Sequence, residues 1–281
     1  MKKRVKKPSD GEKSNKLYII TQDIKNDVQL YSSDASLFKG VFSPPSDNAS
    51  FSTKVIAELK LASPKFDNSG LFTIEDMIKF YVTNPDVAGI SVLLNKKYFK
   101  WNLESIRTIK ELMRAEDIRK PMFFKEFVMS KNQIDLASGF GFDALLLIYK
   151  QLEYIAYDYQ MTGLGFENYM RNLVKYAQHK NIFPVIEVDN EDDLWHVLSM
   201  GFDPEHVGIG VNARQLDTPD LVTDKQVHFD VYGKYAEQLA PYTRFAFSGV
   251  EDLAEVAGYD NKYNGCLIGT YFSGQFAKQN S

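Results

Sequence analysis

The chain has 281 residues, 44% of them hydrophobic and 25% charged, with a formal net charge of −4 at pH 7. This composition is typical of a soluble globular protein, and the length suits one large domain or two small ones. The acidic balance argues against nucleic acid as a partner, and a single cysteine, Cys266, excludes both an internal disulfide framework and a metal site built from several cysteines.

The first residues are basic and polar, with "MKKRVKK" (1–7) followed by "PSDGEKSN" (8–15). A secretory signal would need an apolar stretch after the basic residues, and none follows. No apolar run approaches the ~18 residues that a membrane span requires. We therefore expect a cytoplasmic protein without a membrane segment, whose residues 1–16 form a mobile, solvated tail.

From residue 54 onward, short apolar runs alternate with longer stretches of helical periodicity. The runs, which we interpret as strands, cover residues 54–61, 89–94, 121–128, 144–149, 183–188, 206–213, 244–250 and 265–272. The helical stretches between them cover residues 74–82, 102–115, 130–140, 167–180, 190–200, 224–240 and 250–258. Apolar runs that alternate with helices are typical of parallel strands covered on both faces.

Eight such units predict an α/β fold of the (β/α)8 barrel type, also called a TIM barrel, over residues 54–281. Residues 17–53 are then an N-terminal extension that packs on the barrel. Two irregularities stand out. The connection at 150–166 is long and is either an active-site lid or an insertion. The last unit is short, because only nine residues follow the eighth run.

Polar residues interrupt the apolar runs near their carboxyl ends, which surround the mouth of such a barrel, where sites are built. They are Glu58 and Lys60 in the first run, Lys125 in the third, Glu187 in the fifth, and Asn212 and Arg214 at the end of the sixth. One strand-end charge is usually solvated or ion-paired, but recurrence at the same end of several strands indicates a site. Lysines, glutamates, an arginine and an amide at close range suit an anionic substrate and proton transfers.

Small residues at the ends of the last two runs carry a second signal. Ser248-Gly249 follows the seventh run and Gly269-Thr270 the eighth. The loops after strands 7 and 8 are the usual phosphate site of this architecture, because backbone N–H groups face the ligand there. The pair of motifs favours a small-molecule phosphorylated ligand.

Other residues that could form a functional site give weaker evidence for one. His179, His196, His206 and His228 lack the spacing of metal ligands, so we interpret them as surface or core residues, and Cys266 as a buried, inert thiol. A dinucleotide site is not expected, because the glycines of "GIGVNA" (208–213) lie inside a strand rather than at the start of a helix.

Seven segments occur in an order and spacing that resemble the indole-3-glycerol phosphate synthase family. They are "IAELKLASP", "FFKEFVMSKNQI", "DALLLI", "VIEVDNEDDL", "GIGVNARQLDT", "FSGV" and "LIGTYF". The resemblance runs from about residue 54 to residue 272. It implies conversion of 1-(2-carboxyphenylamino)-1-deoxyribulose 5-phosphate into indole-3-glycerol phosphate by ring closure, decarboxylation and dehydration, without metal or cofactor.

The resemblance also implies a role for each matching residue. Lys125 would be the general acid, Lys60 would contact the substrate carboxylate, and Glu187, supported by Glu58, would transfer protons during dehydration. Asn212 and Arg214 would hold the substrate hydroxyl and the anionic intermediate. The remaining implied contacts are Ser248, Phe99, Phe127 and Leu146 around the substrate, and Gly249, Gly269, Thr270 and Ser63 at the phosphate.

The chain also departs from the family pattern. Phe247 stands where the family usually has a glutamate before Ser-Gly, "SPKFDNSG" (63–70) differs from the usual phosphate-side loop, and "YFKW" (98–101) replaces Tyr-Phe-x-Gly. Two alternatives therefore stay open: a paralogue acting on another aryl- or sugar-phosphate, and a catalytically weak barrel kept for binding. The sequence leaves the oligomeric state undetermined.

Overall fold

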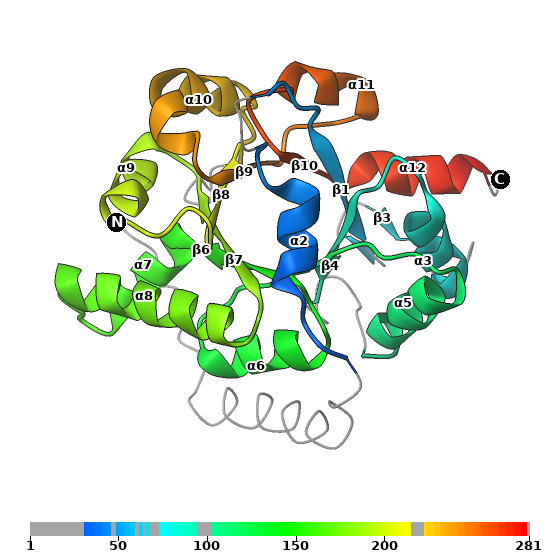
Figure 1. Ribbon diagram of the computed structural model, residues 1–281, viewed down its shortest axis with the longest axis horizontal. Helices are drawn as coiled ribbons and strands as arrows, with labels where there is room; N and C mark the ends of the chain where they lie inside the picture. The colour runs from blue at the N-terminus through cyan, green and yellow to red at the C-terminus, as the bar shows by residue number, and fades with distance from the viewer. Residues whose placement is uncertain are drawn as a thin grey trace.

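A computed structural model describes residues 31–45, 49–59, 62–63, 66–67, 73–94, 103–214 and 222–279. Within these ranges, parallel strands close into a barrel in the order β1-β10-β9-β8-β7-β6-β5-β4, with helices around its outside (Figure 1). The predicted (β/α)8 fold is thus confirmed. The predicted tail, residues 1–16, lies outside the described residues.

The barrel strands lie close to the predicted runs, because each run is apolar on both faces and buried between the barrel interior and the helices. They are β1 (Lys54–Leu59), β4 (Gly89–Leu93), β5 (Met122–Lys125), β6 (Ala144–Ile148), β7 (Phe183–Val188), β8 (Gly208–Asn212), β9 (Thr243–Phe247) and β10 (Gly265–Ile268). Two short strands after β1, β2 (Ala62–Ser63) and β3 (Phe66–Asp67), pair antiparallel outside the barrel.

Helices at the predicted positions form the outer layer. They are α3 (Ile74–Thr83), α5 (Leu103–Ala115), α6 (Lys131–Gly139), α8 (Gly163–His179), α9 (Glu191–Ser199), α10 (Gln226–Leu239) and α11 (Leu253–Val256), which continues as the 3-10 helix η2 (Ala257–Tyr259). Side chains from the strands and these helices form the larger of two apolar clusters, between the barrel wall and the helix ring.

The connection at 150–166, for which the sequence leaves a lid and an insertion as alternatives, is mostly helical: α7 (Tyr149–Asp158) buries Tyr149, Leu152 and Ala156 on one face, and α8 begins at Gly163. The eighth strand was predicted to run to residue 272, but it ends at Ile268 and α12 (Thr270–Gln279) follows. The apolar residues of α12 have helical spacing, and their packing on α3 favours the helix: the Phe272 ring contacts Tyr81 and the Phe276 ring contacts Phe80.

The smaller apolar cluster fills the barrel and includes helix α2 (Ala35–Phe42), which lies across the middle of the barrel in Figure 1. The Phe38 ring lies 6.0 Å from Phe123, 5.5 Å from Phe183 and 5.6 Å from Phe245, measured between ring centroids. Phe183 is the first residue of β7. Helix α2 therefore closes the barrel at the amino-terminal ends of the strands, opposite the predicted mouth.

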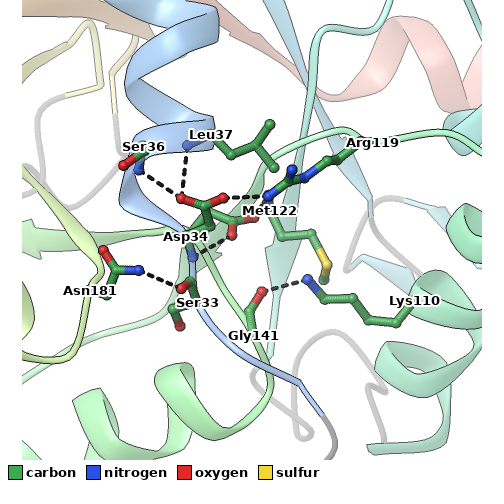
Figure 2. Close-up of polar contacts among 10 residues, drawn as sticks. Ser33, Asp34, Ser36, Leu37, Lys110, Arg119, Met122, Gly141 and Asn181 are labelled. Carbon is green, nitrogen blue, oxygen red and sulfur yellow. Dashed lines mark hydrogen bonds and ion pairs between the residues drawn. The ribbon is translucent and has the colours of Figure 1, made fainter.

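A polar network around the buried carboxylate of Asp143 holds the start of α2 in place. Asp34 caps the helix, since its carboxylate accepts hydrogen bonds from the backbone N–H groups of Ser36 and Leu37 (Figure 2). The backbone N–H of Asp34 donates to the buried carboxylate of Asp143 at 2.9 Å. The second oxygen of Asp143 accepts from the Met122 backbone N–H at 2.8 Å, so one carboxylate joins α2 to the start of β5.

Candidate active site

Glu58 and Lys125 form an ion pair at the carboxyl ends of β1 and β5. The Lys125 Nζ lies 2.6 Å from Glu58 Oε2, and the two side chains reach across β4, which pairs with both strands. The Lys125 side chain is 20% exposed and that of Glu58 is 5% exposed. The ammonium group is therefore held at the inner edge of the mouth, with access to whatever binds there.

Glu187 and Asn212 form the second pair, on the neighbouring strands β7 and β8. Asn212 Nδ2 donates to Glu187 Oε1 at 2.9 Å, while Asn212 Oδ1 accepts from the backbone N–H of Arg214 at 3.0 Å. The amide is thus fixed at both ends. The other oxygen of Glu187, Oε2, is buried and has no hydrogen-bond partner among the described residues.

The surroundings of Glu187 shift its pKa upward. Burial is the largest cause, and the carboxylates of Asp189 and Glu58 act in the same direction. Lys125 and the hydrogen bond from Asn212 oppose the shift. Glu187 therefore interacts electrostatically with both members of the Lys125–Glu58 pair. A carboxyl group with a raised pKa can both give and take a proton nearer to neutral pH.

Asp189 is a part of the mouth that the strand-end reasoning missed. It is buried, and it follows Glu187 by two residues, so it continues the inward-facing set beyond the end of β7. The period-two alternation from Phe183 through Val185 to Glu187 could have identified it, because the next residue in phase is Asp189.

The Ser248-Gly249 motif forms a sharp turn after β9. Both residues have left-handed backbone conformations, with φ of 61° and 76°. A Cβ on Gly249 would lie 3.0 Å from Lys225 Cβ and 3.3 Å from Ala213 Cβ, so the turn packs closely against the chain that follows β8. Gly269 follows β10, and α12 begins at Thr270, which sets the amino-terminal end of this helix at the same end of the barrel.

The other predicted site residues are spread more widely. Arg214 lies just beyond β8 and is exposed; its Nε donates to Thr223 Oγ1 at 3.4 Å. Leu146 is buried in the interior cluster of the barrel, whereas Phe127 is 48% exposed in the segment after β5. The predictions for Lys60, Phe99 and the side chain of Ser63 fall outside the described residues.

Phe247, which departs from the family pattern, lies inside the barrel. It is buried, and its ring stacks on Phe245 with the centroids 6.0 Å apart. A Cβ on Gly210 of β8 would lie 2.1 Å from the Phe247 ring, so the aromatic ring fits only because its neighbour is glycine.

The described ranges contain no group of three or more histidine, cysteine or acidic residues that could hold a metal ion. None of their helices combines the length and the apolar character needed to cross a membrane.

The fold and the site together define a (β/α)8-barrel enzyme whose mouth carries acid–base residues at its strand ends. Residues 11–280 match the family model described as indole-3-glycerol phosphate synthase. The chain belongs to the indole-3-glycerol phosphate synthase family, as the resemblance of its strand-end motifs predicted.

Individual relatives agree with this assignment. The indole-3-glycerol phosphate synthase of Aquifex aeolicus is 29% identical over 78% of this chain and 75% of the relative. That of Pyrobaculum aerophilum is 31% identical over 77% of this chain and 75% of the relative. That of Sulfurisphaera tokodaii is 32% identical, and this match spans 59% of the chain and 58% of the relative's length.

Proposed function

We propose that the protein catalyses the conversion of 1-(2-carboxyphenylamino)-1-deoxyribulose 5-phosphate into indole-3-glycerol phosphate. Ring closure, decarboxylation and dehydration would take place at the barrel mouth. The observation that carries the proposal is the pairing of Lys125 with Glu58 at 2.6 Å, beside a buried Glu187 whose pKa is raised. The reaction needs no metal or organic cofactor in this proposal, and its cellular compartment would be the cytoplasm.

Lys125 is the general acid of the proposed first step. The aryl carbon attacks the ribulose carbonyl, and the carbonyl oxygen must gain a proton as the new bond forms. An ammonium group held by Glu58 at the inner edge of the mouth is suited to deliver it. Lys60, two residues after Glu58 in the sequence, would contact the substrate carboxylate that leaves as carbon dioxide.

Glu187 is the proton carrier of the proposed dehydration, which forms the pyrrole ring after the carboxylate has left. Its Oε1 is occupied by Asn212, and its Oε2 has no hydrogen-bond partner among the described residues. That second oxygen is the one suited to exchange a proton with substrate. Asn212 and Arg214 would orient the substrate hydroxyl and the anionic intermediate.

The phosphate would bind at the turns after β9 and β10. Gly249, Gly269 and Thr270 would provide small side chains and backbone N–H groups there, and the first N–H groups of α12 have no acceptor within the helix. Ser63, which follows β1 in the chain, would be a further phosphate contact. Ser248, Phe127, Phe99 and Leu146 would contact the rest of the substrate.

The test is a fluorescence assay of indole-ring formation by the wild-type protein. We expect turnover that follows saturation kinetics with the carboxyphenylamino substrate. Absence of any indole product, with intact folding and tight binding of indole-3-glycerol phosphate, would replace the enzyme proposal with a binding role.

A second candidate is a related reaction on another aryl- or sugar-phosphate. Phe247 favours it, because this ring makes the barrel interior apolar at a position where the resemblance implies a carboxylate. Comparing kcat/KM for the carboxyphenylamino substrate and for ring-substituted analogues separates the two candidates: a preference for an analogue would support the second.

A further inference from the structure

His228 lies behind the barrel wall and joins the ends of two site strands. It is the third residue of α10 and is fully buried. Its Nε2 lies 3.1 Å from the carbonyl oxygen of Val211, near the end of β8, and 3.1 Å from that of Phe247, the last residue of β9. Its other ring nitrogen, Nδ1, lies 3.1 Å from the hydroxyl of Tyr259.

These contacts determine where the ring carries its proton. Two carbonyl oxygens face Nε2, and both can only accept, so Nε2 must be the N–H donor. Nδ1 then accepts from the Tyr259 hydroxyl. Burial lowers the pKa of His228 to about 4, although both carbonyl contacts oppose this shift, so the ring is neutral at pH 7.

The two carbonyl groups mark the last rung of the β8–β9 ladder. The carbonyl oxygen of Phe247 also accepts from the Ala213 backbone N–H at 2.9 Å. Beyond this bond the strands separate: the Ala213 carbonyl accepts from Asp224 N–H instead, and Ser248 enters the left-handed turn.

Each peptide group that His228 holds immediately precedes a residue of the site. Val211 precedes Asn212, which bonds to Glu187, and Phe247 precedes Ser248. A shift of either carbonyl would therefore move Asn212 or the turn relative to the Glu187 carboxyl group.

We propose that His228 is a positioning residue of the active site: its Nε2–H ties the final peptide groups of β8 and β9 together and so fixes Asn212 and the Ser248-Gly249 turn relative to Glu187. The roles of Asn212 and Ser248 in this inference rest on the proposed function. A residue that only filled the space would not need hydrogen bonds at both ring nitrogens, and α10 could supply an apolar side chain for that purpose.

A pair of amide substitutions tests the proposal, because each amide replaces one ring nitrogen. In His228→Gln the side-chain N–H group reaches the place of Nε2 and can still donate to the two carbonyls. In His228→Asn the shorter amide reaches the place of Nδ1 and cannot. Tyr263→Phe is the matched control, since the Tyr263 hydroxyl donates to the His228 backbone carbonyl at 2.7 Å, whereas the strand-end carbonyls are contacted by the His228 ring.

Steady-state kinetics on folded protein give the first readout. We expect His228→Asn to lower kcat by about tenfold to a hundredfold with a smaller change in KM, because displacement of a positioned group acts mainly on the chemical step. His228→Gln should recover most of this loss, and Tyr263→Phe should retain the wild-type kcat. Equal kcat values for the Gln and Asn variants, or an equal loss in Tyr263→Phe, would overturn the proposal.

NMR of protein labelled with 15N in both its histidine and its asparagine residues gives a readout that does not depend on turnover. We expect the His228 ring to carry its proton on Nε2 at pH 7, and the Asn212 side-chain amide resonance to shift in His228→Asn but not in Tyr263→Phe. A proton on Nδ1, a charged ring, or an unchanged Asn212 resonance would overturn the proposal. If the wild-type protein forms no indole product, the proposed function fails. The NMR measurement then still tests whether the His228 ring donates through Nε2 and positions Asn212.

Discussion

Among single residues, Glu187 shows how the barrel modifies an ordinary carboxyl group. Its strand places it inside the mouth, and burial raises its pKa because water can no longer solvate the charged form. One oxygen is fixed by Asn212, and the other has no hydrogen-bond partner among the described residues. The group is thus costly to ionise and suited to proton exchange.

We predict that Glu187→Gln lowers kcat and raises stability at neutral pH. Loss of a general acid–base group typically costs about 10²- to 10⁴-fold in rate. A carboxyl group whose pKa is raised in the folded state binds its proton more tightly there, so its contribution to stability is present at low pH and lost as pH rises through the folded pKa. The amide cannot ionise, so it avoids this loss.

Turnover assays and urea unfolding at pH 5 and pH 8 check this prediction. The stability advantage of the variant should be larger at pH 8 than at pH 5. A variant that keeps the wild-type kcat would contradict the assigned role.

The contribution of His228 to stability changes with pH in the opposite direction to that of Glu187. Its pKa is about 4 in the folded state, below the ordinary value of 6.5, so the unfolded chain binds a proton more readily between these values. Its contribution to stability is complete above pH 6.5 and is lost as pH falls toward 4. The phenols of Tyr259 and Tyr263 face the ring, and burial raises both of their pKa values, so neither ionises in this window.

We therefore predict that wild type loses about 2 kcal/mol more unfolding free energy than His228→Gln between pH 7.5 and pH 5. Urea denaturation of both proteins at the two pH values measures this difference, in which the other titrating groups cancel. Parallel losses in the two proteins would show that the ring is not held neutral.

Most helices and strands could be predicted from the sequence, because each barrel strand is a short apolar run between stretches of helical periodicity. The run at 183–188 and strand β7 have the same bounds. The helices that escaped prediction depend on tertiary contacts. Helix α12 packs its aromatic side chains on α3, and helix α2 is held by the phenylalanines that it inserts into the barrel.

Helix α2 also offers a prediction, since Asp143 accepts backbone hydrogen bonds from both Asp34 and Met122. We expect Asp143→Ala to destabilise the protein by about 2–3 kcal/mol, because two N–H groups lose their buried acceptor. Urea unfolding measures this loss. Folded protein should keep its turnover, since the network lies at the end of the barrel opposite Lys125.

Arg119→Ala is the matched control. Arg119 forms an ion pair with Asp34 in the same network, but its side chain is 71% exposed, so its removal should cost less than about 1 kcal/mol. Equal losses in the two variants would show that the surface pair, rather than the buried carboxylate, anchors α2.

In the whole molecule, the two ends of the barrel differ in kind. Helix α2 and its phenylalanines close one end with apolar packing, while charged and amide residues gather at the other. The site could be predicted as far as it follows strand ends, which gave Glu58, Lys125, Glu187 and Asn212. His228 could not, because its role arises from the packing of α10 behind β8 and β9, and no local pattern encodes that contact.

In the proposed function the strand-end residues at this mouth carry out the reaction, and Lys125→Ala tests their role most directly. Indole-ring formation should fall by about 10²-fold or more, because ring closure loses its proton donor. Lys131→Ala, which removes an exposed lysine at the start of α6, should keep the wild-type rate. A Lys125→Ala protein as active as wild type would contradict the account.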